Sequence, residues 1–139
     1  MAINDGSTLA AADLLDSWVA TGLTITPGTN WAINSYALRQ TVGKVIGWIQ
    51  ATYSGATLTV SAAGVVPGVP VTVATLPTGW VQTGLAPSVP IPGYESTPSI
   101  YRSWSTRVTA STVQLLNGTP GQTLVSGCQI RFYVDFYTI

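Results

Sequence analysis

Two carboxylates, Glu95 and Asp135, are the residues of this 139-residue chain that could carry out hydrolysis. They are the acidic residues that lie beyond the first sixteen positions. A pair of carboxylates can hydrolyse a glycosidic bond, one as acid and the other as base or nucleophile. Glu95 lies in a proline-rich stretch and Asp135 on the polar side of the last predicted strand, so their spacing does not pair them. A glycan hydrolase therefore stays an alternative, and the expectation is that the protein is not an enzyme.

The chain has few residues that could support other catalytic chemistry or bind a metal ion. The chain has no histidine, which is the commonest general base and metal ligand. A Ser-His-Asp triad cannot be built, and the single cysteine, Cys128, cannot supply a zinc site. We expect Cys128 to be a small buried residue. A Ser-Lys dyad with Lys44 is chemically feasible, but no serine is placed beside that lysine. We expect no cofactor and no metal.

Five tryptophans and six tyrosines could bind a ligand by stacking. Trp31, Trp48 and Trp104 fall within predicted strands, where such residues usually fill cores and subunit interfaces. Trp80 and Tyr94 lie in or beside turn-rich segments. We predict outward contacts at Trp80, Tyr94 and Tyr101, which would stack on glycans if the chain is a carbohydrate-binding module.

The elements that carry these residues are mostly strands. Residues 31–139 are rich in β-branched and aromatic residues between turn signals, which predicts about eight antiparallel strands in a β-sandwich or jelly roll. In residues 42–52 one set of alternate side chains is apolar, and residues 129–137 alternate strictly between an apolar and a polar aromatic face. The predicted strands cover 32–41, 42–52, 56–62, 71–76, 99–109, 112–116 and 129–137. Residues 84–98 contain four of the prolines and predict an irregular loop.

Residues 1–30 form a different segment. Apolar residues recur at helical spacing between positions 9 and 18, which predicts a short helix on an N-terminal arm. The first sixteen residues carry a charge of −3 and the remainder +3. This division has two explanations. One is that aspartate stabilises the start of a helix, and the other is that the arm docks on a basic surface of a neighbouring molecule. The residues expected to anchor the arm or contact another subunit are Asp5, Leu9, Asp13, Leu14, Asp16 and Trp18.

The composition of the chain limits the kinds of partner that we expect it to bind. Hydrophobic residues make up 46% of the chain and charged residues 7%, against about 25% charged residues in an ordinary domain. Such a surface is poorly protected from association, so we expect other subunits to cover part of it. Five basic residues in a neutral chain make nucleic acid a poor partner, and no apolar run reaches transmembrane length.

Three short segments resemble a known family. The run from Val71 to Trp80, Val-Thr-Val-Ala-Thr-Leu-Pro-Thr-Gly-Trp, and the run from Gly55 to Val60, Gly-Ala-Thr-Leu-Thr-Val, resemble segments of bacteriophage tail-fibre knobs and related virion surface proteins. The opening from Asn4 to Leu14, with Asp-Gly-Ser-Thr-Leu and Asp-Leu, resembles the start of phage fibre and baseplate chains. The family often has Arg-Pro after the aromatic residue, where this chain has Val81 and Gln82.

The resemblance implies a non-enzymatic virion component, usually a homotrimer with a β-sandwich or jelly-roll knob. Our leading hypothesis is a small capsid decoration or head-fibre protein, made in the host bacterial cytoplasm and held on the virion surface by its arm. Its partners would be further copies of itself and the major capsid protein or another virion protein. The alternatives are a tail-fibre or receptor-binding knob that recognises a host glycan, and a carbohydrate-binding module.

Overall fold

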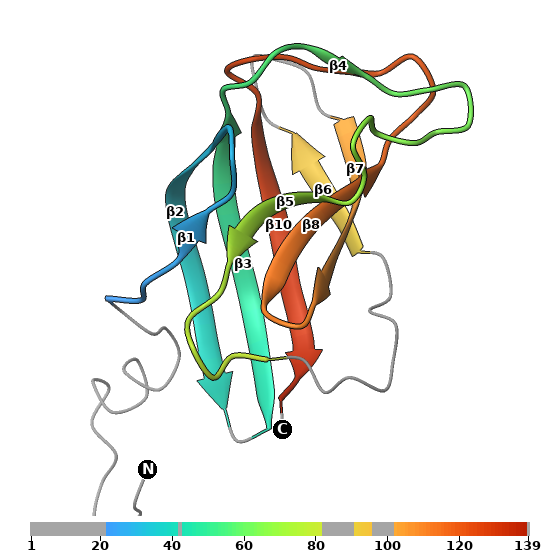
Figure 1. Cartoon of the computed structure of the whole chain (residues 1–139). Coiled ribbons are helices and arrows are strands. Elements are labelled where there is room, and N and C mark those ends of the chain that lie inside the picture. The colour runs from blue at the N-terminus through green and yellow to red at the C-terminus, as the bar shows by residue number, and fades with distance from the viewer. Residues whose placement is uncertain (1–21, 42, 82–90, 96–101, 139) are drawn as a thin grey trace, which may run out of the picture.

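The computed structural model describes residues 22–41, 43–81, 91–95 and 102–138 (Figure 1). The predicted helix at 9–18 and the first 21 residues of the predicted arm lie outside the described residues. The contacts predicted for six residues of this segment therefore lie outside them as well: Asp5, Leu9, Asp13, Leu14, Asp16 and Trp18. The described part contains ten strands. They are β1 (Thr26–Pro27), β2 (Trp31–Thr41), β3 (Lys44–Tyr53), β4 (Leu58–Thr59), β5 (Val71–Thr75), β6 (Ile91–Glu95), β7 (Arg102–Thr109), β8 (Thr112–Asn117), β9 (Thr123–Leu124) and β10 (Gln129–Tyr137).

Eight strands form one antiparallel sheet in the order β1-β5-β8-β7-β6-β10-β3-β2. Figure 1 shows the sheet folded over on itself, so that β1 lies in front of β2 and β5 crosses in front of β3 and β10. The small β4-β9 sheet lies at one end. The predicted all-β, sandwich-like fold is confirmed, and no helix of the described residues is long and apolar enough to span a bilayer.

The core lies between the two layers, and it follows the predicted alternation. In β10 the side chains of Ile130, Phe132, Val134 and Phe136 are buried, while the residues between them are partly or fully exposed. In β3 the side chains of Val45, Ile49, Ala51 and Tyr53 point inward, because successive side chains of a strand project to opposite faces. The Trp31 ring packs edge-on against Phe132, with 5.6 Å between the ring centroids.

Strand β6 is where the sequence prediction was wrong. The loop predicted at 84–98 contains a strand that pairs with β7 over five residues and with β10 at Tyr94 and Glu95. Proline is normally kept out of central strands because it has no N–H to donate. Pro92 is accommodated because the β10 ladder ends at Tyr94. Gly93 allows close packing, since a Cβ there would lie 2.9 Å from the Thr106 methyl group.

Candidate functional site

Glu95 is the centre of a buried polar cluster. Its side chain is fully buried, and it accepts hydrogen bonds from the Arg102 Nε and Nη2 atoms at 3.1 and 2.8 Å. It also accepts from the Trp104 indole N–H at 3.0 Å and from the Cys128 thiol at 3.1 Å. A buried carboxylate is costly unless it is paired and hydrogen-bonded. The contacts with four donor groups meet that requirement and join β6 and β7 to the segment before β10.

Cys128 was expected to be buried, and the structure confirms this. Burial raises the pKa of the thiol, and the backbone hydrogen bond of Val125 acts in the opposite direction. The hydrogen bond and charge of Glu95 raise this pKa further. Because the thiolate is the reactive form of cysteine, we expect this thiol to react slowly in the folded protein.

The two carboxylates that could have formed a hydrolytic pair are separated by the sheet. Glu95 lies directly opposite Ile130, so both side chains project to the core face. Asp135 is five positions further along β10, on the outer face, where its half-exposed carboxylate lies 3.2 Å from the Lys44 ammonium. The structure therefore does not bring Glu95 and Asp135 together as a hydrolytic pair.

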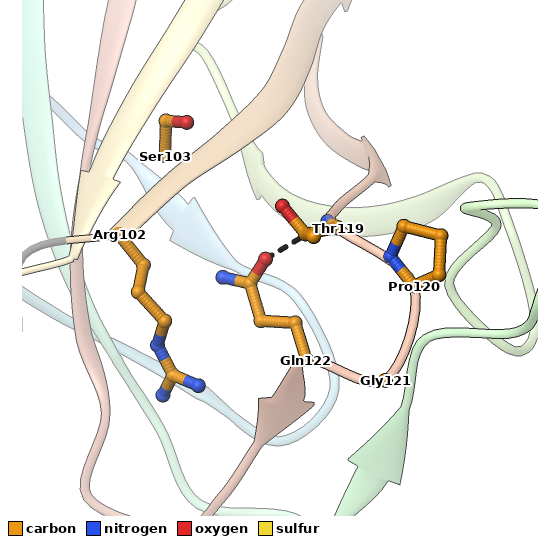
Figure 2. A pocket seen from close by; sticks show the side chains of 6 residues that line it. All are labelled: Arg102, Ser103, Thr119, Pro120, Gly121 and Gln122. Atoms are coloured by element: carbon orange, nitrogen blue, oxygen red, sulfur yellow. Dashed lines mark hydrogen bonds between the residues drawn. The ribbon is translucent and has the colours of Figure 1, made fainter.

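An open hollow of about 530 Å³ lies beside the Glu95 cluster. One wall is the start of β7, and the other is the turn that connects β8 to β9 (Figure 2). The lining residues are Arg102, Ser103, Thr119, Pro120, Gly121 and Gln122. Arg102 is shared with the cluster and is partly exposed, so the hollow reaches the solvent at the side of the buried ion pair.

Gln122 gives this hollow an unusual feature. Its side-chain oxygen accepts the Thr119 backbone N–H at 2.9 Å, which fixes the orientation of the amide. The amide nitrogen is then buried without a hydrogen-bond partner among the described residues. In Figure 2 this nitrogen is on the side of the amide that faces Arg102. An unpaired buried donor costs about 1–3 kcal/mol, so an acceptor at this position would be stabilising.

The outer side of β3 and β10 carries a second candidate surface, the Trp48 face. Arg131 lies over the Trp48 ring at 4.2 Å from its centroid and donates to the Gln50 side chain at 3.2 Å. Lys44 lies over the Tyr137 ring at 5.3 Å. The face consists of Lys44, Ile46, Trp48, Gln50, Gln129, Arg131, Tyr133, Asp135 and Tyr137.

These contacts hold the Trp48 face in one arrangement before any partner binds. Gln50 also donates to Gln129 at 3.0 Å, which links β3 to β10 across the ladder. Tyr137 is 65% exposed, and Trp48 and Tyr133 are half-buried. Aromatic residues and arginine are enriched in protein interfaces, and ordering side chains in advance lowers the entropic cost of binding. The arrangement suits recognition of another protein surface.

The structure gives different outcomes for the three residues that were predicted to contact a ligand. Trp80 is 7% exposed and belongs to the hydrophobic core, so the prediction of an outward ring was wrong. Its backbone N–H bonds to the Pro77 carbonyl at 3.0 Å, and this turn places the ring over the core. Tyr94 lies in β6, but its side chain and the whole of Tyr101 are outside the described part of the chain.

Sequence reasoning did not find the hollow. Arg102 and Gln122 are twenty residues apart, and the pairing of β6, β7 and β10 that brings Glu95 and Arg102 together was masked by the prolines. The Trp48 face was visible as alternation in two segments. Its contacts depend on the register that sets Tyr133 opposite Trp48.

Comparison with protein-family models, with curated proteins and with solved structures finds no match for this chain.

Proposed function

We propose that this protein is a non-enzymatic structural component of a phage virion, a small surface protein that associates with further copies of itself through the Trp48 face. The observation that carries the proposal is the pre-ordered contact network on the outer side of β3 and β10, in which Arg131 covers Trp48 and bonds to Gln50.

The character of this face favours a protein partner. It combines half-buried rings with amides and two cations, Lys44 and Arg131, and its residues are engaged with one another before binding. Its one ion pair, between Lys44 and Asp135, is exposed, and exposed pairs of this kind contribute about 0–1 kcal/mol. The Arg131 charge keeps its contacts with the Trp48 ring and Gln50 when the face is buried, so it is not left without partners in an interface.

Composition gives separate support. Only 7% of the chain is charged, and a domain with so few charges has little protection against association. A defined assembly would bury part of this surface. The trimeric state and the virion location come from the resemblance to phage fibre and decoration proteins, and the anchoring role of residues 1–22 from the acidic, helix-forming sequence of that segment.

The virion assignment is tested on particles. Phage particles assembled in cells that express the native chain are purified on a density gradient, and the chain is detected by immunoblotting. We expect it to co-sediment with the particles, and a chain without residues 1–22 to remain at the top of the gradient.

The matched control is Val125→Ala, an exposed position in the connection between β9 and β10, which should bind particles as the parent chain does. If the parent chain is absent from particles, the virion proposal fails. Undiminished occupancy by the truncated chain removes only the anchoring role of the arm.

A further inference from the structure

The outer side of the sheet is positively charged. Arg39 lies on β2, and since its neighbour Leu38 is buried in the core, Arg39 projects to the same outer side as the Trp48 face. Together with Lys44, Arg131 and Asp135 of that face, this side carries three positive charges and one negative charge, a net charge of +2. It therefore holds most of the +3 that the chain carries beyond residue 16.

The other described charges give this side no acidic partner. Arg102 and Glu95 form the buried pair and cancel each other, and Arg107 lies on β7, where it bonds to Gln114. A second copy of the chain has one segment of the opposite sign to offer. This segment is its first sixteen residues, which carry a charge of −3 and no base.

The described chain starts beside the edge strand β2. The Leu23 backbone N–H donates to the Tyr36 hydroxyl group at 3.1 Å, and Leu23 packs against the core. Tyr36 is opposite the buried Ile49, so its side chain lies on the core-facing side of β2. Figure 1 shows this start of the chain, in blue, next to the edge of the sheet. The N-terminal segment therefore joins the domain on the side of β2 that is opposite to the Trp48 face.

The length of the connection decides whose face the segment can occupy. The four steps from Trp18 to Gly22 span at most about 14 Å when fully extended. A packed layer lies about 10 Å above a sheet, and β10 is two strand spacings, about 10 Å, from β2. These two displacements alone need that whole length, and the path also has to pass around β2. Trp18 therefore does not reach the middle of its own Trp48 face, and the face within its reach is that of a neighbouring copy.

The sequence of residues 9–18 is complementary to this side of the sheet. On the predicted helix, Asp13 is three positions from Asp16 and four from Ser17, so these residues share one side. Leu14 and Trp18 are four positions apart and share another side. The two carboxylates balance the net charge of +2, and the apolar side suits the half-buried rings of the Trp48 face.

We propose that residues 9–18 of one copy lie on the Trp48 face of the next copy, with Asp13 and Asp16 beside the cations of the outer side. This inference rests on the proposed association of copies, and it names the segment of the neighbouring copy that the face receives. Residues 1–8, with Asp5, remain for contact with the particle.

Disulfide trapping between two full-length variants tests the proposal. Ser17→Cys and Tyr137→Cys are co-expressed, one of them with an affinity tag, so that a mixed pair has its own mobility on a non-reducing gel. Tyr137 is 65% exposed on the Trp48 face, whereas Cys128 is 2% exposed and stays out of the reaction. Val125→Cys, at an exposed position away from the face, replaces Tyr137→Cys as the matched control. We expect at least about ten times more of the mixed pair with Tyr137→Cys than with Val125→Cys, because docking raises the local concentration of the two thiols.

Charge exchange tests whether the cations recognise the segment. Asp13→Lys and Asp16→Lys, added to the Ser17→Cys chain, should abolish the excess of the mixed pair over the control. Arg39→Glu and Arg131→Glu, added to the Tyr137→Cys chain, should restore it, because the signs are then exchanged on both partners. Circular dichroism should show that all the variants are folded.

The outcomes separate this inference from the proposed association. Equal yields with Tyr137→Cys and Val125→Cys, in a parent chain that sediments as a trimer, overturn the docking of residues 9–18 and leave the association of copies standing. A disulfide that forms only when both cysteines are on one chain places the segment on its own face and also overturns the inference. A monomeric parent chain without a mixed pair removes both proposals.

Discussion

Glu95 and Arg102 face each other directly across β6 and β7 and are joined by two hydrogen bonds of 2.8 and 3.1 Å. The carboxylate is fully buried, and the guanidinium side chain is 27% exposed. The pair is a structural junction, because it connects β6, which the prolines made hard to predict, to the rest of the sheet.

The first prediction concerns this junction. Glu95→Gln keeps the shape of the side chain but removes its charge, so Arg102 loses a charge-assisted contact in a largely buried position. We expect the free energy of unfolding to fall by about 3 kcal/mol, the lower end of the cost of breaking a buried pair. Urea denaturation monitored by tryptophan fluorescence measures the change.

Asp135→Asn is the matched control for that experiment. It removes the exposed partner of Lys44 and should change stability by less than about 1 kcal/mol. Equal losses in the two variants would contradict the structural role given to Glu95.

A second prediction concerns the reactivity of Cys128. The buried thiol is hydrogen-bonded to Glu95, and burial raises its pKa, so a thiol reagent such as iodoacetamide should modify it only after the protein opens. Modification should be at least about a hundredfold slower in buffer than in denaturing urea. A native rate close to the rate in urea would show that the thiol is exposed.

A third prediction follows from the same pKa shift. The raised pKa of Cys128 means that the folded chain holds the thiol proton more tightly than the unfolded chain does. The resulting stability is complete below about pH 8.5, the ordinary thiol pKa. It is lost as the pH rises from there through the folded pKa, with a slope of at most about 1.4 kcal/mol per pH unit.

Urea denaturation at several pH values between about 8 and 9.5 measures this dependence. In Cys128→Ala the slope should disappear, although the variant will be less stable at every pH because its packing is altered. Parallel curves for the parent chain and the variant would mean that Cys128 does not cause the dependence.

A fourth prediction concerns Gly47 in the middle of β3. Its φ is +141°, and a Cβ at this position would lie 1.9 Å from the Ala37 carbonyl oxygen of β2. Gly47→Ala should lower the free energy of unfolding by about 3 kcal/mol, because it combines backbone strain with a backbone clash. Gly43→Ala, where φ is +78° and no atom lies within 4 Å, should cost only about 1–2 kcal/mol. Thermal unfolding followed by circular dichroism compares them, and a similar loss in both would contradict the close approach of β2 and β3.

Much of the fold could be predicted from local pattern. Residues 129–137 alternate without interruption, and they form β10 with the expected inward and outward faces. The strand predicted at 42–52 is β3, displaced by one or two residues, because Gly43 begins the hairpin with a positive φ that the pattern does not show.

The parts that could not be predicted depend on contacts between distant segments. The five residues of β6 have no periodicity of their own and become a strand because β7 and β10 supply partners. Trp80 lies beside turn residues that suggest exposure, yet the turn at Pro77 returns its ring to the core. The strand predicted at 56–62 shortens to Leu58–Thr59 because only these two residues pair with β9 in a ladder, while Val60 bonds to the turn at Gly121 and Gln122.

Sedimentation equilibrium of the purified full chain measures whether its copies associate through the Trp48 face. We expect a single species of three times the chain mass of 14.5 kDa. Tyr133→Glu, which places a charge opposite Trp48 in the middle of the face, should convert it to the monomer. Val125→Glu, at an exposed position away from the face, should leave the trimer intact, and circular dichroism should show both variants folded. A parent chain that sediments as a monomer, or a Tyr133→Glu variant with the mass of the parent assembly, would show that the Trp48 face does not hold copies of the chain together.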